Sequence, residues 1–322
     1  MKDFMSLSFP MLLLLGFSLL LASCSDMKKN SNTALAAREE NQSQSPAGFE
    51  SERKQAEQQA RPEVEKQRKQ SEEDAKKDLD QDAQAAISQT RKAVNAIAQN
   101  KADEAISAIE QATGKINILL ARNPSTALIP VDLAVEVIDT APQDTQAILE
   151  IGQDASRALD DKNYPTARAL LYRLMSEIRV RTFNLPLATY PDALKEAARL
   201  LDQKQPDQAK DVLLTGLNTL VVVDRVTPLP LLLARDAINQ AQAKSQQDKN
   251  ASQALLEIAK SQAERARELG YAGKDQEYAA LNNQISTLEK QLKGSGDVTV
   301  AFSKLKDKLS AFLKRQSEQK RG

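Results

Sequence analysis

The residues with the most definite chemistry lie near the start of the chain, where Leu21-Ala22-Ser23-Cys24 closes an apolar run of 14 residues. This run is shorter than the ~20 residues of a membrane-spanning helix and has the length of the hydrophobic region of a signal peptide. Small residues followed by cysteine are the pattern that lipoprotein signal peptidase cleaves. We predict that residues 1–23 are a signal peptide and that Cys24 becomes a lipid-modified first residue, which anchors the chain to the membrane.

Ser25 follows this cysteine. An Asp in that place looks like the inner-membrane retention signal of enteric-type Gram-negative cells, so Ser25 favours the outer membrane. No later stretch approaches the ~18 apolar residues of a membrane helix. We therefore expect a lipid-anchored protein of the cell envelope that faces the periplasm.

The composition gives little support for a catalytic site, a metal site or a disulfide. The 322 residues contain no histidine, which excludes a Ser-His-Asp triad and the usual zinc ligand sets, and Cys24 is the only cysteine, which excludes an internal disulfide. Adjacent carboxylates such as Asp160-Asp161 lack the spacing of a calcium loop and are typical of solvated turns. We predict that the protein is not an enzyme and has no catalytic residue, metal or cofactor.

Four arginines are the remaining site candidates. One hypothesis is a small basic patch for an anionic ligand; the alternative is that the arginines cover a helix or strand face and pair with local acids. The chain as a whole has 44 basic and 44 acidic residues, so it has no net charge that would attract nucleic acid. The four candidates are Arg168, Arg173, Arg179 and Arg181.

The apolar pattern divides the mature chain into three regions. Residues 24–82 are charged and have almost no large apolar side chains, so we predict a spacer that is disordered or an exposed helix. Residues 83–247 are predicted to form a helical repeat domain. Residues 248–322 are predicted to form C-terminal helices with a coiled-coil-like hairpin.

The predicted repeat consists of amphipathic helical hairpins with similar turns. Each turn places a small alanine (Ala105, Ala167 or Ala209) early in the second helix, which lets the two helices pack closely. Each second helix then leads to a proline-marked segment that stops it. The large apolar residues of the second and third hairpins are predicted to be core: Leu170, Leu171, Leu174, Met175, Leu213, Leu214, Leu217 and Leu220.

β-branched residues accompany the prolines. Residues 131–137 alternate strictly, and residues 178–182 and 221–226 are rich in Val or Ile, which favours short strands. Three such pieces, one per repeat, would pair into a small sheet, unless residues 178–182 continue their helix. The predicted fold class is mainly α: repeated amphipathic helical hairpins with short β-strands near the proline-marked segments, plus a C-terminal helical hairpin.

The C-terminal region has its own pattern. A helix over residues 252–269 ends at Gly270, and apolar residues between 278 and 312 then keep a three-four spacing. This spacing predicts a helical hairpin with a coiled-coil seam. The seam either binds a partner helix or closes on itself.

Four short motifs complete the pattern: Ile129-Pro130-Val131-Asp132, Leu185-Pro186-Leu187, Pro228-Leu229-Pro230-Leu231 and Leu269-Gly270-Tyr271. With the hairpin turns they resemble the YfdX family of exported bacterial proteins, over about residues 85–292. The resemblance implies a mostly helical fold and a role in stress tolerance, notably acid stress, with chaperone-like action. It carries no catalytic residues, and the cysteine motif and long spacer of this chain depart from simpler members.

Two roles suit such a protein. The first is a membrane-tethered holdase or adaptor that binds envelope proteins or unfolded clients; the second is a structural component that self-associates through its helices as a homo-oligomer. An enzyme that uses only carboxylates has the least support. Because Asp and Glu lose their charge near pH ~4, we expect acid to loosen or rearrange an oligomer of this chain.

Overall fold

The computed structural model describes residues 46–271, 276–294, 297–318 and 320–321. The predicted signal peptide, Cys24 and Ser25 lie outside the described residues. Among the described helices, none has the length and apolar character needed to cross a membrane.

The helices are α2 (Pro46–Lys77), α3 (Gln81–Ala98), α4 (Ala102–Arg122), α5 (Thr145–Asp160), α6 (Tyr164–Tyr172), α7 (Tyr190–Asp202), α8 (Pro206–Asn218), α9 (Leu229–Lys244), α10 (Lys249–Glu268), α11 (Gln276–Leu292) and α12 (Thr299–Glu318). The strands are β1 (Leu128–Asp139), β2 (Ser176–Pro186), β3 (Val221–Pro228) and β4 (Lys320–Arg321).

The strands form one antiparallel sheet in the order β1-β2-β3-β4, in which β4 adds only two residues at the edge of β3. Val135 of β1 lies opposite Val180 of β2, and Thr182 of β2 lies opposite Val223 of β3. Branched side chains of this kind pack well on a pleated surface. The sheet confirms the three predicted strands, and residues 178–182 belong to β2 instead of continuing a helix.

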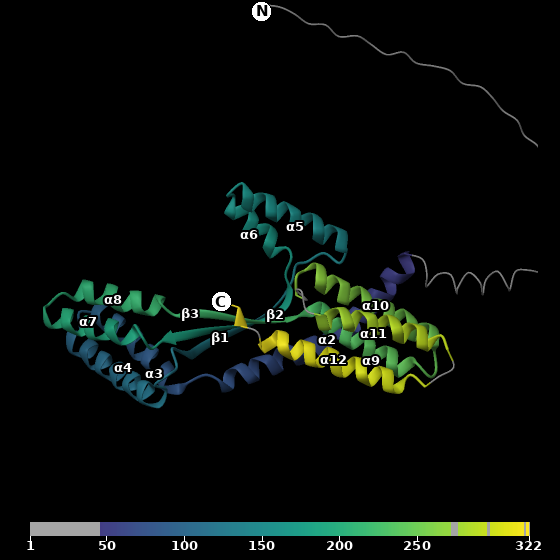
Figure 1. The fold of residues 1–322 in the computed structure, drawn as a ribbon. Coiled ribbons are helices and arrows are strands. Elements are labelled where there is room, and N and C mark those ends of the chain that lie inside the picture. Colours follow the sequence, from purple (N-terminus) through teal and green to yellow (C-terminus); the bar gives the residue numbers. More distant parts are fainter. Residues whose placement is uncertain (1–45, 272–275, 295–296, 319, 322) are drawn as a thin grey trace, which may run out of the picture. The chain divides into compact units, whose positions relative to one another are not determined.

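Three helical hairpins, α3–α4, α5–α6 and α7–α8, alternate with the strands along the chain (Figure 1). Each turn holds one non-glycine residue at φ 58°, which is Asn100, Lys162 or Lys204. The alanine five positions further on is buried in all three hairpins. These matching turns confirm the repeat and set a common register, in which residue 100 corresponds to residues 162 and 204.

The first and third hairpins pack on each other. Helix α3 contacts α8 and α4 contacts α7, so the four helices share one apolar core with the adjoining ends of β1 and β2. Tyr190 of α7 donates its hydroxyl to that of Thr90 in α3 at 2.8 Å across this contact. Burial raises the pKa of Tyr190 to about 12. Two of the three hairpins of one chain, α3–α4 and α7–α8, therefore cover each other's apolar faces.

A second core joins α9, α10, α11 and α12. The three-four seam predicted between residues 278 and 312 is buried in it, as Ile285 of α11 and Leu309 of α12 illustrate. Helix α11 contacts α10 and α12, and α12 also contacts α9. Of the two alternatives for the seam, the structure favours the one in which it closes within the chain.

Helix α2 differs from the predicted spacer. It lies against β1, β2, α9 and α10, and its Ala56, Ala60 and Ala75 are buried. Alanines add little to a hydrophobic pattern, but their small size allows close helix packing. On the exposed side, ion pairs such as those of Arg68 with Glu65 and Glu72 are at 2.9 Å. Of the two predicted alternatives, residues 46–77 form a helix, but its buried alanines make it part of the fold instead of a free spacer.

Glu289 of α11 makes the stability of this second core depend on pH. Burial raises the pKa of its carboxyl. A carboxyl with a raised pKa in the folded state costs stability once the pH exceeds its unfolded value of ~4.3, and costs nothing well below that value. Because solvent screens part of this charge, we expect Glu289→Gln to increase the free energy of unfolding by only about 0.5 kcal/mol near pH ~7 and to change it little near pH ~4.

Urea denaturation at both pH values measures this difference. Lys290→Gln, at the exposed neighbouring position, is the control. Equal effects of Glu289→Gln at the two pH values would contradict the assignment.

Candidate functional site

Two of the four candidate arginines lie in the sheet. Arg181 donates from Nε and Nη2 to the two carboxylate oxygens of Asp224, both at 3.0 Å, and this contact raises the pKa of its guanidinium. Arg179 donates from Nε to Glu177 at 2.8 Å and also lies 3.7 Å from Asp224. Carboxylates of the same sheet therefore neutralise both side chains, which favours local ion pairs over an anionic-ligand patch.

The other two arginines belong to the α5–α6 hairpin. Arg168 lies within α6 and Arg173 caps its C-terminus. Both are exposed. Elsewhere in the described chain, no group of three or more His, Cys, Asp or Glu side chains is arranged to hold a metal ion.

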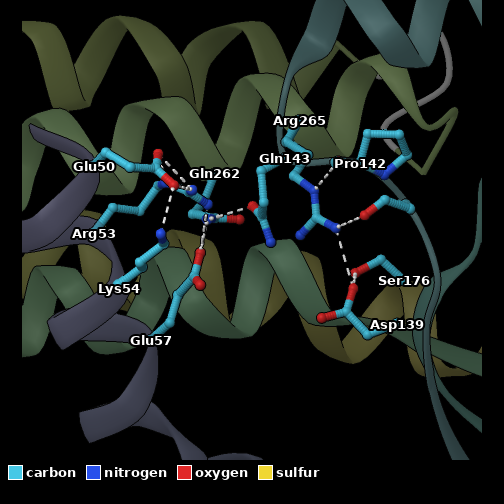
Figure 2. A network of polar contacts seen from close by, with 11 residues as sticks. Glu50, Arg53, Lys54, Glu57, Asp139, Pro142, Gln143, Ser176, Gln262 and Arg265 are labelled. Carbon is cyan, nitrogen blue, oxygen red and sulfur yellow. Dashed lines mark hydrogen bonds and ion pairs between the residues drawn. The ribbon is translucent and has the colours of Figure 1, made fainter. Parts of the chain in front are cut away.

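A polar network fastens the base of this hairpin (Figure 2). The buried Arg265 of α10 donates from Nε to the carbonyl of Pro142 and from Nη2 to that of Ala141, both at 2.9 Å. Its Nη2 also donates to the carboxylate of Asp139 at 3.1 Å, and Ser176 donates to the same oxygen at 2.7 Å. Asp139 ends β1 and Ser176 begins β2, so these bonds hold the segments that enter and leave the hairpin.

Helix α2 joins the network through Gln262 of α10. The side-chain amide of Gln262 donates to Glu57 at 3.1 Å and to Gln143 at 3.5 Å. Arg53 pairs in turn with Glu57 at 2.9 Å and with Glu50 at 2.6 Å (Figure 2). The start of α5 is thereby tied to two helices that are distant in sequence.

One face of the α5–α6 hairpin carries uncovered apolar side chains. Leu149 and Leu159 of α5 are exposed, as are Tyr164 and Leu171 of α6. Leu149 and Leu159 each follow a buried residue of α5 and so lie about 100° further round its axis, and Tyr164 and Leu171 lie about 40–60° from the buried Ala167 of α6 in the same sense of rotation. Because the two helices of a hairpin are antiparallel, this rotation brings both exposed stripes to the same side. The hairpin therefore has one buried inner contact and one open apolar face.

This finding corrects part of the predicted core. Leu171 was expected to be buried with its neighbours, and so was Leu214 of α8, but both are exposed. Leu213, the residue before Leu214, is buried as expected. Helical periodicity places residues on a face, but the covering of that face depends on which other elements pack there.

Comparisons with known proteins connect the repeat region with one family. Residues 86–226 match the family model described as YfdX protein. A solved structure of YfdX from Salmonella Typhi is similar at 13% identity over 47% of this chain and 93% of that chain, with a TM-score of 0.32. A search of curated proteins finds no match.

The fold and the hairpin surface define a mainly helical protein, in which repeated hairpins alternate with the strands of an antiparallel sheet and one hairpin keeps an open apolar face. Residues 86–226, which span nearly all of the three hairpins and their strands, are the part of the chain that matches the YfdX family. The motifs beyond residue 226 lie outside the matched segment.

Proposed function

We propose that this protein is a membrane-tethered, non-enzymatic binding protein of the cell envelope, with a chaperone-like role in stress tolerance, notably acid stress. The observation that carries the proposal is the open apolar face of α5–α6. Contiguous exposed apolar surface marks sites of protein interaction. The lipid anchor expected at Cys24, the outer membrane favoured by Ser25 and the family resemblance support a periplasm-facing position.

Site-specific photo-crosslinking in cells tests this proposal. A photo-crosslinking amino acid at Tyr172, an exposed residue of α6, is expected to trap several envelope proteins, and more of them at acid pH. The same probe at Glu104, an exposed polar position of α4, serves as the control. The proposal fails if Tyr172 traps no more protein than Glu104 at either pH and the purified chain does not suppress aggregation of acid-denatured proteins.

A second role, an assembly adaptor that acts by self-association, is favoured by the internal repeat. Two of the three hairpins already bind each other through the equivalent face. In the experiment above, one dominant partner would indicate this adaptor role. Many unrelated proteins would indicate a chaperone.

A further inference from the structure

We infer that the open face of the α5–α6 hairpin binds the same face of a second copy of this chain, and that the two hairpins together form an intermolecular four-helix bundle. The inference rests on the proposed function in that it names a partner for the same face. Its argument comes from the register of the repeat, the exposure of equivalent residues and the charges of the two helices.

Leu159 of α5 shows the difference between the hairpins most directly. The register that aligns residue 162 with residues 100 and 204 makes Leu159 equivalent to Ile97 of α3 and Leu201 of α7. Ile97 is 5% exposed and Leu201 is 8% exposed, whereas Leu159 is 47% exposed. The same apolar position is therefore covered in two hairpins and uncovered in the third.

Leu171 of α6 repeats this observation on the second helix. Its equivalents are Ile109 of α4 and Leu213 of α8, which are 2% and 0% exposed, against 47% for Leu171. In both covered cases the partner is a hairpin of the same repeat, because α3 packs on α8 and α4 on α7. The described chain has three of these hairpins, and two of them pack on each other. The equivalent partner for the third, α5–α6, is therefore the α5–α6 hairpin of a second copy of the chain.

Charge favours the same arrangement. In the packed pair, the first helix of one hairpin contacts the second helix of the other, so two α5–α6 hairpins would place each α5 on the other copy's α6. Helix α5 has three acidic residues and one arginine, a net charge of −2. Helix α6 with its C-cap has Arg168 and Arg173 and no acid, a net charge of +2. The opposite net charges of the two helices favour this pairing over α5 on α5.

The arrangement also offers Arg168 and Arg173 a partner other than the anionic ligand of the first sequence hypothesis. Their partner would be the acidic α5 of the second copy. The apolar residues between the charged positions exclude water from the contact, and the charges select the partner and its orientation.

Photo-crosslinking from position 159 of the full chain in cells tests the inference. We expect a product that contains two copies of this chain, with the second copy linked within residues 145–173. Leu171→Asp in the same chain is expected to lower the yield of this product about tenfold or more, because a carboxylate would be buried without a partner. Val300→Asp, at an exposed apolar position of α12, is the matched control and should leave the yield unchanged.

A charge exchange adds an independent measurement. Arg168→Glu, at an exposed position about 60° round α6 from Leu171, should also reduce the product, and adding Asp160→Arg, at the exposed position after Leu159 in α5, to the same chain should restore it. Circular dichroism distinguishes lost pairing from lost folding, and the probe at 159 in the otherwise unchanged chain does not depend on any variant.

The outcomes separate the two proposals. Products that contain only other proteins, or a second copy linked outside residues 145–173, overturn self-pairing and leave the proposed binding function standing. Absence of any product from position 159 overturns self-pairing. The proposed function is then decided by the probe at Tyr172 and the aggregation assay.

Discussion

Replacing Arg265 by methionine is expected to lower the free energy of unfolding by about 2–4 kcal/mol. Methionine keeps the apolar length of the side chain but donates no hydrogen bond. The buried carbonyl of Ala141 and the partly buried carbonyl of Pro142 would each lose a charged donor at 2.9 Å. Asp139 would lose one as well, although solvent reaches its carboxylate and limits that part of the cost. The two carbonyls therefore account for most of the expected loss.

The matched control is Arg267→Met, two residues further along α10. Arg267 is exposed and pairs only with its neighbour Glu268 among the ion pairs of the described residues, so its replacement should change stability by less than about 0.5 kcal/mol. Urea denaturation followed by circular dichroism gives both values. Faster amide hydrogen exchange at residues 139–144 in Arg265→Met would locate the damage at the hairpin base. Equal stability of the two variants would show that this network does not hold the hairpin.

The same network bears on binding. A hairpin that is held at both its entry and its exit presents its open face in one orientation, and preorganisation of this kind lowers the entropy lost on association. Arg265 thus acts at a distance from the apolar face, through the segments that position α5 and α6. For this reason, we expect the stability of the α5–α6 hairpin base to affect how strongly the open face of this hairpin binds a partner.

Local signals in the sequence were sufficient for the hairpins and the strands. Ala105, Ala167 and Ala209 are all buried as their small size predicted, and the β-branched runs all form strands. These features depend on contacts between residues close in sequence or on the intrinsic preference of a side chain. Sequence reasoning works well where the determining contact is local.

Long-range contacts were not predictable in the same way. Arg265 reaches residues 123 to 126 positions earlier, and only its place on the apolar side of α10, beside the buried Gln262 and Ala266, signalled a buried charge. The packing of helix α2 against the rest of the fold could not be predicted, because its buried stripe consists of alanines and not of large apolar residues. Leu171 was misplaced because the pattern of α6 equals that of α4 and α8, and only the missing partner makes it different.

The C-terminal seam leads to the second large effect, at Phe302 of α12. Phe302 is buried in the core that α12 shares with α9, α10 and α11. Removing a fully buried aromatic ring takes away its transfer free energy and leaves a cavity, at a cost of about 3–5 kcal/mol. We expect Phe302→Ala to lower the free energy of unfolding by that amount, as measured by urea denaturation. Val300→Ala, at an exposed position of the same helix, should change it by less than about 0.5 kcal/mol.

This comparison also decides which surface joins two copies of the chain. If the seam is closed within one chain, Phe302→Ala weakens folding, yet molecules that remain folded keep the cross-link from position 159. If instead the seam were an open association surface, Phe302→Ala would leave the stability of the single chain nearly unchanged and abolish the self-cross-link. The second result would show that two copies of the chain associate through α11–α12 and not through α5–α6. The first is expected, because the apolar seam residues are buried within one chain, whereas those of the α5–α6 face are not.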